Sequence, residues 1–219
     1  ALVVGISGGI DSSVVSTLCA NTGRKTIVLT MPIKQIKSQH DLSLLHAKWL
    51  KQKYKNVEHH LLEMDKIFTS FSQVLTKFNN DHGYANSRAR LRMATLYQVA
   101  AANNGIVVGT GNKVEDFGVG FYTKYGDGGV DISPIADCTK TQVWELGKHL
   151  GVSQDIIDTP PTDGLWDDGR NDVQQLGMSY EDLEKAMENK NDPNYKKYLE
   201  IREKNLHKMN PIPVCKFNE

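Results

Sequence analysis

The chain is poor in cysteine and has no excess of charge of either sign. Its 219 residues include three cysteines, Cys19, Cys138 and Cys215, which are far apart and form no Cys-x-x-Cys pair. This pattern excludes a disulfide framework and a cysteine-based zinc site, and it is typical of the reducing cytoplasm. Lys and Arg together number 26, as do Asp and Glu, so the formal net charge is zero. A balanced chain exerts no long-range pull on nucleic acid or on an anionic membrane, and we expect neither as a partner.

Long apolar runs and leader-like segments are also missing. No apolar stretch approaches the ~20 residues that cross a bilayer, and no signal peptide is visible. Hydrophobic residues make up 39% and charged residues 24%, which is ordinary for a globular protein. We therefore expect one cytoplasmic domain over residues 1–219. The chain opens inside a predicted strand, so N-terminal residues can be missing from it.

Strand-like and helix-like segments alternate through the first half of the chain. Their spacing predicts strands at 2–6, 26–31, 57–62 and 106–109, and helices at 11–20, 40–54, 66–78 and 87–103. Such alternation predicts an α/β fold, a doubly wound parallel sheet flanked by helices, which is Rossmann-like. Ligands of such sheets bind beyond the carboxyl ends of the strands.

The second half is less regular. Its spacing predicts helices at 139–150, 179–188 and 194–208. The segment 117–129 is rich in glycine and aromatic residues, and the prolines and glycines of 159–177 indicate no regular element there. Long irregular segments in a compact domain are usually lids or binding loops. We expect both segments to order around a ligand.

A loop of small residues follows the first strand. Residues 7–13 read Ser-Gly-Gly-Ile-Asp-Ser-Ser and lead into a helical pattern. The glycines let the backbone approach a ligand closely, and the N–H groups of the first helical turn attract anions. Ser7, Ser12 and Ser13 add hydroxyl donors, while Asp11 would repel a bare phosphate and so indicates an intervening Mg²⁺. An ordinary glycine turn with serine caps is the alternative interpretation.

The loop differs from the two common nucleotide-binding loops. Neither Gly-x-x-x-x-Gly-Lys-Ser/Thr nor a Gly-x-Gly-x-x-Gly after the first strand occurs. The string Ser-Gly-Gly-x-Asp-Ser instead resembles the pyrophosphate-binding loop of the N-type ATP pyrophosphatases, whose fold is adenine nucleotide alpha hydrolase-like. Further characteristic strings occupy 87–93, 109–115, 123–131, 139–144 and 161–166. Together with the loop, they resemble ammonia-dependent NAD synthetase over nearly the whole chain, and Lys-Tyr-Gly-Asp-Gly-Gly at 124–129 is the most specific of them.

The resemblance implies a reaction and a set of site residues. The family amidates deamido-NAD with ammonia, through an adenylated carboxylate, and yields NAD, AMP and pyrophosphate. The positions implied for ATP are Gly5, Ile6, Ser7, Gly8, Gly9, Ile10, Asp11, Ser12, Thr110, Lys140 and Thr162. Those implied for deamido-NAD are Arg90, Lys124, Asp131, His207 and Lys208. Asp11 and Glu115 are the implied Mg²⁺ ligands, and Asp11 and Lys140 the implied catalytic residues. The family acts as a homodimer.

Several of these positions also have plainer interpretations. Glu115 could be a solvated surface carboxylate, and Thr162 could be a turn residue. Lys140 could merely occupy the first turn of its helix, although a cation gains nothing from the helix dipole there.

The three arginines of the 87–93 string alternate along the predicted helix. At helical pitch Arg88 and Arg92 share a face, which we predict to be solvated, whereas Arg90 lies on another face and is the better anion binder. Phe121 and Tyr122 are candidates for stacking on a nicotinate or adenine ring.

Other functions compete with this one. Another N-type ATP pyrophosphatase, either tRNA-modifying or GMP synthetase-like, would share the first loop, but a tRNA-modifying enzyme should have a basic surface. A nucleotide-binding protein without turnover would not need two metal carboxylates and a lysine together.

Overall fold

The computed structural model describes residues 1–162, 164–165 and 171–217. Its sheet contains the strands β1 (Leu2–Gly5), β2 (Thr26–Thr30), β3 (Val57–Leu61) and β4 (Ile106–Val107), all parallel, in the order β3-β2-β1-β4. In the register, Val3 lies opposite both Ile27 and Val107. The predicted parallel α/β sheet is confirmed.

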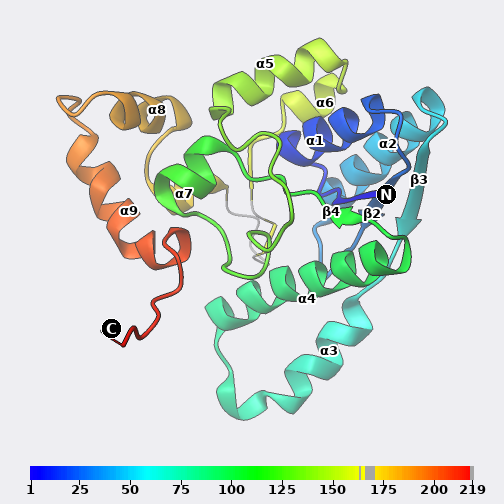
Figure 1. Cartoon of the computed structure of the whole chain (residues 1–219), viewed down its shortest axis with the longest axis horizontal. Helices are drawn as coiled ribbons and strands as arrows, with labels where there is room; N and C mark the ends of the chain where they lie inside the picture. The colour runs from blue at the N-terminus through cyan, green and yellow to red at the C-terminus, as the bar shows by residue number, and fades with distance from the viewer. Residues whose placement is uncertain (163, 166–170, 218–219) are drawn as a thin grey trace.

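Helices cover both faces of this sheet, which explains why the inner residues of β1 and β2 are apolar and buried (Figure 1). Val4 and Val28 face α1 (Ile10–Asn21), α2 (Lys37–Lys53) and α5 (Lys140–Leu150). The alternate residues Val3 and Ile27 face α3 (Asp65–Val74) and α4 (Asp81–Ala102). The fold is therefore doubly wound.

A further apolar cluster lies to one side of the sheet. It joins a π-helical segment, η2 (Lys113–Val119), to α8 (Tyr180–Glu188) and α9 (Tyr195–Met209) (Figure 1). Val114 and Leu183 are fully buried in it. This cluster, called the outer cluster below, lies beside the core of the sheet, and Trp144 packs against both.

Several boundaries differ from those predicted. The helix expected at 66–78 is divided into α3 and a short 3-10 helix, η1 (Thr76–Phe78). Helix α4 begins at Asp81 rather than at residue 87, because Asn80 caps it by accepting from the Gly83 N–H at 2.7 Å. A short helix, α6 (Gln154–Ile157), follows α5.

The expectation of no regular element within 159–177 was wrong. Helix α7 (Asp172–Leu176) lies there, because Asn171 and Gln174 form a capping box at its start. Residues 163 and 166–170 of that expected lid, and with them part of the 161–166 string, lie outside the described residues.

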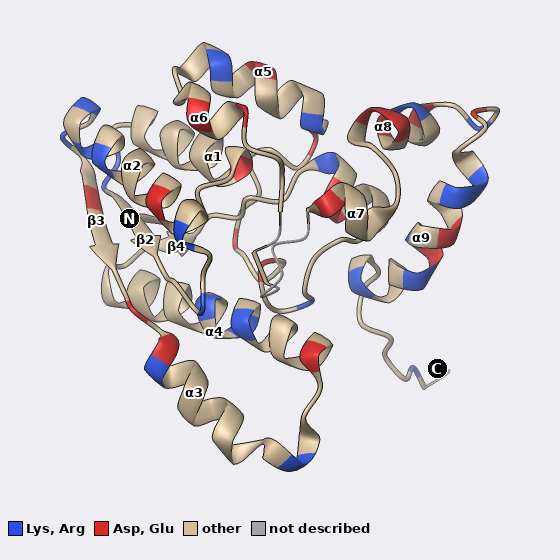
Figure 2. Cartoon of the chain, turned by 180° about the vertical axis from the view of Figure 1, so that it is seen from behind, with Lys and Arg blue, Asp and Glu red and all other residues tan. Residues whose placement is uncertain are grey.

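Charge of both signs is spread over the surface helices. Helices α8 and α9 each carry acidic and basic side chains (Figure 2). In the part of the chain that the structure describes, no helix is both long enough and apolar enough to span a membrane.

The order of the strands positions the site. From β1 the chain moves outward through β2 to β3, and then returns to place β4 on the other side of β1. The carboxyl ends of β1 and β4 therefore flank a switch point of the sheet, where α/β proteins bind ligands. The loops that follow Gly5 and Val107 both lie at this crevice.

Candidate active site

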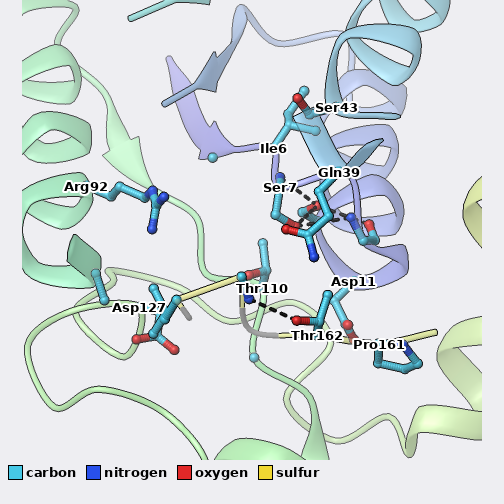
Figure 3. Close-up of a pocket in the computed structure, with 18 of the residues that line it drawn as sticks. Ile6, Ser7, Asp11, Gln39, Ser43, Arg92, Thr110, Asp127, Pro161 and Thr162 are labelled. Atoms are coloured by element: carbon cyan, nitrogen blue, oxygen red, sulfur yellow. Dashed lines mark hydrogen bonds between the residues drawn. The ribbon is translucent and has the colours of Figure 1, made fainter. Parts of the chain in front are cut away.

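A cavity lies at this switch point. Its walls come from the loop after β1, the start of α2, the middle of α4, the segment after β4 and residues 159–162 and 164–165 (Figure 3). Every residue predicted for ATP or for the metal lines it. The structure thus brings together residues from four separate strings of the sequence, 7–13, 109–115, 139–144 and 161–166.

The glycine loop is shaped by close packing against α2. Gly8 has φ of 91°, and a Cβ there would lie 2.6 Å from the Gln39 carbonyl oxygen. Only glycine fits this position. The Ser7 and Ser12 hydroxyls lie 3.0 Å apart and line the cavity. Both the Ser12 and Ser13 hydroxyls donate to the Gly9 carbonyl, at 3.1 and 2.9 Å, but Ser13 is fully buried and does not line the cavity, so its prediction as a third donor was wrong.

The ammonium group of Lys140 connects the two acidic residues predicted to bind the metal. Its Nζ lies 2.6 Å from Asp11 Oδ2 and 2.8 Å from Glu115 Oε1. The Lys140 side chain is only 2% exposed, whereas the side chains of Asp11 and Glu115 are 17% and 15% exposed. A buried ammonium therefore holds two carboxylates that still reach the cavity.

Two further residues fix these carboxylates. The Asn112 amide donates to Asp11 Oδ1 at 3.0 Å, and its carbonyl oxygen accepts from the Val114 and Glu115 N–H groups. The Tyr180 hydroxyl lies 2.5 Å from Glu115 Oε1. Sequence reasoning missed both residues. Asn112 occupies the 109–115 string, but no local signal marks Tyr180, which reads as the start of a charged surface helix.

The network sets the charges of its members. Burial alone would lower the pKa of Lys140, but Asp11 and Glu115 outweigh burial and raise it, so the ammonium stays charged. Burial would raise the pKa of Glu115, but the hydrogen bonds and charge of Lys140 lower it. Burial raises the pKa of Asp11, and neighbouring Glu115 raises it further against the opposing effect of Lys140.

Asp116, on η2 next to Glu115, adds a third carboxylate to the cavity wall. Burial raises the pKa of Asp116 well above its ordinary value, and neighbouring Asp127 and Glu115 add to the shift. The Asp116 carboxylate lies against Gly111, where a Cβ would meet its Oδ2 at 2.0 Å. Asp127 lies on the cavity wall as well (Figure 3). The predictions included neither carboxylate.

Three of the residues predicted for deamido-NAD, Arg90, Lys124 and His207, contact one another in sequence outside this cavity. Exposed Arg90 donates from Nε to the Lys124 carbonyl at 3.3 Å, and Lys124 Nζ donates to the His207 carbonyl at 2.6 Å. Lys208 donates to the Gly120 carbonyl at 2.8 Å. Helices α4 and α9 and the segment 117–129 meet there. This group does not line the cavity in the described part of the chain.

Asp131 lies apart from that group. Its carboxylate accepts from the Tyr97 hydroxyl at 3.1 Å and from the Val107 N–H at 2.7 Å, so it supports strand β4. Of the two candidate stacking rings, Phe121 lines the cavity. Tyr122 instead lies beneath Lys208, with Nζ 5.6 Å from the ring centroid.

The prediction that Arg88 and Arg92 occupy a solvated face was wrong. Arg88 is 6% exposed, and its Nη1 donates to the Leu165 carbonyl at 3.0 Å. Arg92 donates to the Met31 carbonyl at 2.9 Å and to Gln35 Oε1 at 3.0 Å, and it points into the cavity (Figure 3). Helical spacing shows which arginines share a face, but the packing of α4 against the sheet decides which face is covered.

The family model and the curated relatives that match this chain belong to the same family. The NAD synthase family model matches residues 1–215. A curated relative from Archaeoglobus fulgidus, an NH(3)-dependent NAD(+) synthetase, is 33% identical, and the alignment covers 100% of this chain and 89% of that protein. Another of the same name from Saccharolobus solfataricus is 38% identical, over 97% of this chain and 72% of that protein.

Solved structures agree with this family. An NMN synthetase from Francisella tularensis superimposes with a TM-score of 0.90 at 32% identity, covering 99% of this chain and 89% of that one. An NH3-dependent NAD synthetase from Campylobacter jejuni gives a TM-score of 0.76 at 27% identity, covering 98% and 89% of the respective chains. The alignments to these four proteins each cover 97–100% of this chain.

Proposed function

The chain belongs to the NAD synthase family, and from this premise we propose that it amidates the nicotinate carboxylate of deamido-NAD with ammonia, at the expense of ATP. The observation that carries the proposal is the Asp11–Lys140–Glu115 cluster beside a glycine loop at the switch point of the sheet. An anion-binding loop next to two carboxylates and a lysine suits a reaction that splits a nucleotide.

The chemistry proceeds in two stages. A carboxylate is a poor electrophile, so its oxygen first attacks the α-phosphorus of ATP, which gives a mixed anhydride with AMP and releases pyrophosphate. Ammonia then attacks the activated carbonyl carbon, and AMP leaves. The N–H groups of residues 8–11 and the hydroxyls of Ser7 and Ser12 would hold the departing phosphates, and the Lys140 ammonium would offset their charge.

The donor set fits Mg²⁺. Asp11 and Glu115 are partly exposed carboxylates on one cavity, and magnesium in nucleotide sites usually takes one or two carboxylates together with phosphate oxygens. Bound there, the ion would neutralise phosphate charge during cleavage. The remaining ATP contacts in this proposal come from Thr110 and Thr162, which line the same cavity.

The dinucleotide would lie along the neighbouring basic group. Arg90, Lys124 and Lys208 supply cations for its phosphates where α4 and α9 meet. His207 and Asp131 follow from the same resemblance, and the exposed Asp131 carboxylate, which accepts from the Tyr97 hydroxyl and the Val107 N–H, keeps acceptor positions for the dinucleotide.

We further propose a homodimer in the cytoplasm. Three large apolar side chains of α3 and η1, Ile67, Val74 and Phe78, are 54%, 82% and 77% exposed, which suits burial against a second copy. Its thiols, unpaired within the described residues, suit a reducing compartment. Light scattering coupled to size-exclusion chromatography tests the dimer, and a monomer at micromolar concentration would refute it.

Pyrophosphate release tests the reaction. Release should depend on deamido-NAD, and NAD should form only when ammonium is added. Release without the acid substrate, or dependence on a tRNA or a purine nucleotide acceptor, would contradict the assignment.

One observation favours a second candidate, amidation of the mononucleotide of nicotinic acid to NMN. The fold of this chain matches the Francisella NMN synthetase with a TM-score of 0.90, against 0.76 for the Campylobacter NAD synthetase at similar coverage. Both substrates present the same nicotinate carboxylate. Measuring kcat/KM for each acid at saturating ATP and ammonium decides between them.

A further inference from the structure

Tyr180 opens helix α8 and belongs to no string tied above to the reaction. It is 4% exposed, and its ring meets Trp144 edge-on with centroids 6.0 Å apart. Lys140 Nζ lies 4.9 Å from the centroid of the same ring. The outer cluster therefore reaches the ammonium that holds both carboxylates.

The hydroxyl of Tyr180 reaches two acidic side chains. It lies 2.5 Å from Glu115 Oε1 and 2.8 Å from Asp172 Oδ2. Lys140 Nζ donates to the same Glu115 oxygen at 2.8 Å. A phenol has one proton, and the shorter contact assigns it to Glu115, so the tyrosine and Lys140 Nζ both donate to Oε1. The other oxygen, Oε2, can then be turned toward a ligand in the cavity.

Helix α8 holds the tyrosine firmly in this place. Glu184 lies one turn after Tyr180 on the same face of the helix. Its carboxylate accepts from the Thr141 N–H at 2.9 Å and from the Thr141 hydroxyl at 2.8 Å. One helix thus contacts both Glu115 and the residue that follows Lys140.

We propose that Tyr180 is a positioning residue that orients Glu115 for a divalent cation at the ATP site. The inference rests on the metal site of the proposed function, and the tyrosine acts on Glu115 rather than on a substrate. Partners that orient metal ligands typically change metal affinity by about 10- to 100-fold when they are removed.

The test is Tyr180→Phe, which keeps the ring and removes the hydroxyl. Binding of Mn²⁺ in the presence of a non-hydrolysable ATP analogue, measured by electron paramagnetic resonance, should weaken about 10-fold or more. The Mg²⁺ concentration for half-maximal turnover should rise in parallel, while kcat at saturating Mg²⁺ recovers. Tyr198→Phe is the matched control, because Tyr198 is buried in the same cluster at 7% exposure, and it should bind Mn²⁺ like the parent.

A double-mutant cycle shows whether the tyrosine acts through Glu115. On a Glu115→Gln background, Tyr180→Phe should change Mn²⁺ affinity by less than about twofold. A single Tyr180→Phe variant within about twofold of the parent, or a Tyr198→Phe variant weakened equally, overturns the inference. The Mn²⁺ measurement needs no turnover, so a parent protein that binds the ion in a Tyr180-dependent way but does not amidate deamido-NAD would refute the proposed reaction alone.

Discussion

Replacing Lys140 with methionine should sharply destabilise the fold. Methionine keeps an unbranched apolar stem but removes the ammonium that lies within 2.8 Å of both Asp11 and Glu115. The two carboxylates would then lie close together, largely out of water, without their shared counter-charge. Wild-type packing of the stem would remain, so the loss isolates the electrostatic role.

The expected magnitude follows from the burial of the network. Removing one partner of a buried ion pair usually costs about 3–5 kcal/mol, because the remaining charge is left uncompensated. For a domain whose total stability is about 5–15 kcal/mol, this is a large fraction. At about 2–4 °C per kcal/mol for a chain of this size, the melting temperature should fall by roughly 6–20 °C.

Urea unfolding at pH 7 without divalent cations measures the effect. Lys113→Met is the matched control, because Lys113 pairs at 3.0 Å with an Asp137 side chain that is 97% exposed, and an exposed pair contributes little. Added Mg²⁺ should raise the melting temperature of Lys140→Met more than that of the parent, since the ion can supply the missing positive charge. A loss below about 1 kcal/mol, as for a solvated surface pair, would refute the account of the network.

Three further changes test other parts of the molecule. Asp11→Asn should abolish pyrophosphate release while circular dichroism shows an intact fold, because Lys140 keeps Glu115 as its counter-charge; normal turnover would remove Asp11 from the metal site. Arg90→Ala should raise the KM for deamido-NAD more than that for ATP, and an equal change in both would show that Arg90 is misplaced. Burial lowers the pKa of His46 from 6.5 to about 4; the neutral ring therefore stabilises the fold above about pH 6.5, and this contribution, roughly 3 kcal/mol at most, is lost as pH falls toward 4. His46→Gln should flatten the dependence of unfolding free energy on pH across that window, and an unchanged slope would contradict it.

The sheet and the nucleotide loop could be predicted because both depend on local signals. Continuous apolar runs mark buried parallel strands, and Ser-Gly-Gly between a strand and a helix has few alternative uses. Even the meeting of Asp11 with residues after β4 follows from the rule that parallel strands end at one edge. The pairing of both carboxylates with Lys140 could not be predicted from the sequence, since the lysine is 129 residues from Asp11.

The errors arose where packing between distant elements decides the environment. Arg88 and Arg92 appear solvated from their charge, but α4 turns that face toward the sheet and the cavity. Tyr180 and Asp172 join the site through a segment whose sequence pattern indicated only a loop and a surface helix. Spacing within one helix carries no information about which partner covers it.

The two carboxylates that pair with Lys140 belong to elements that pack in different apolar clusters. Asp11 stands on α1, whose neighbours Ile10 and Val14 pack on the sheet, whereas Glu115 stands on η2, whose Val114 and Val119 pack with α8 and α9. Trp144 packs against both clusters. A substitution on α9 that repacks the outer cluster would therefore move Glu115, while the sheet keeps Asp11 and its loop in place.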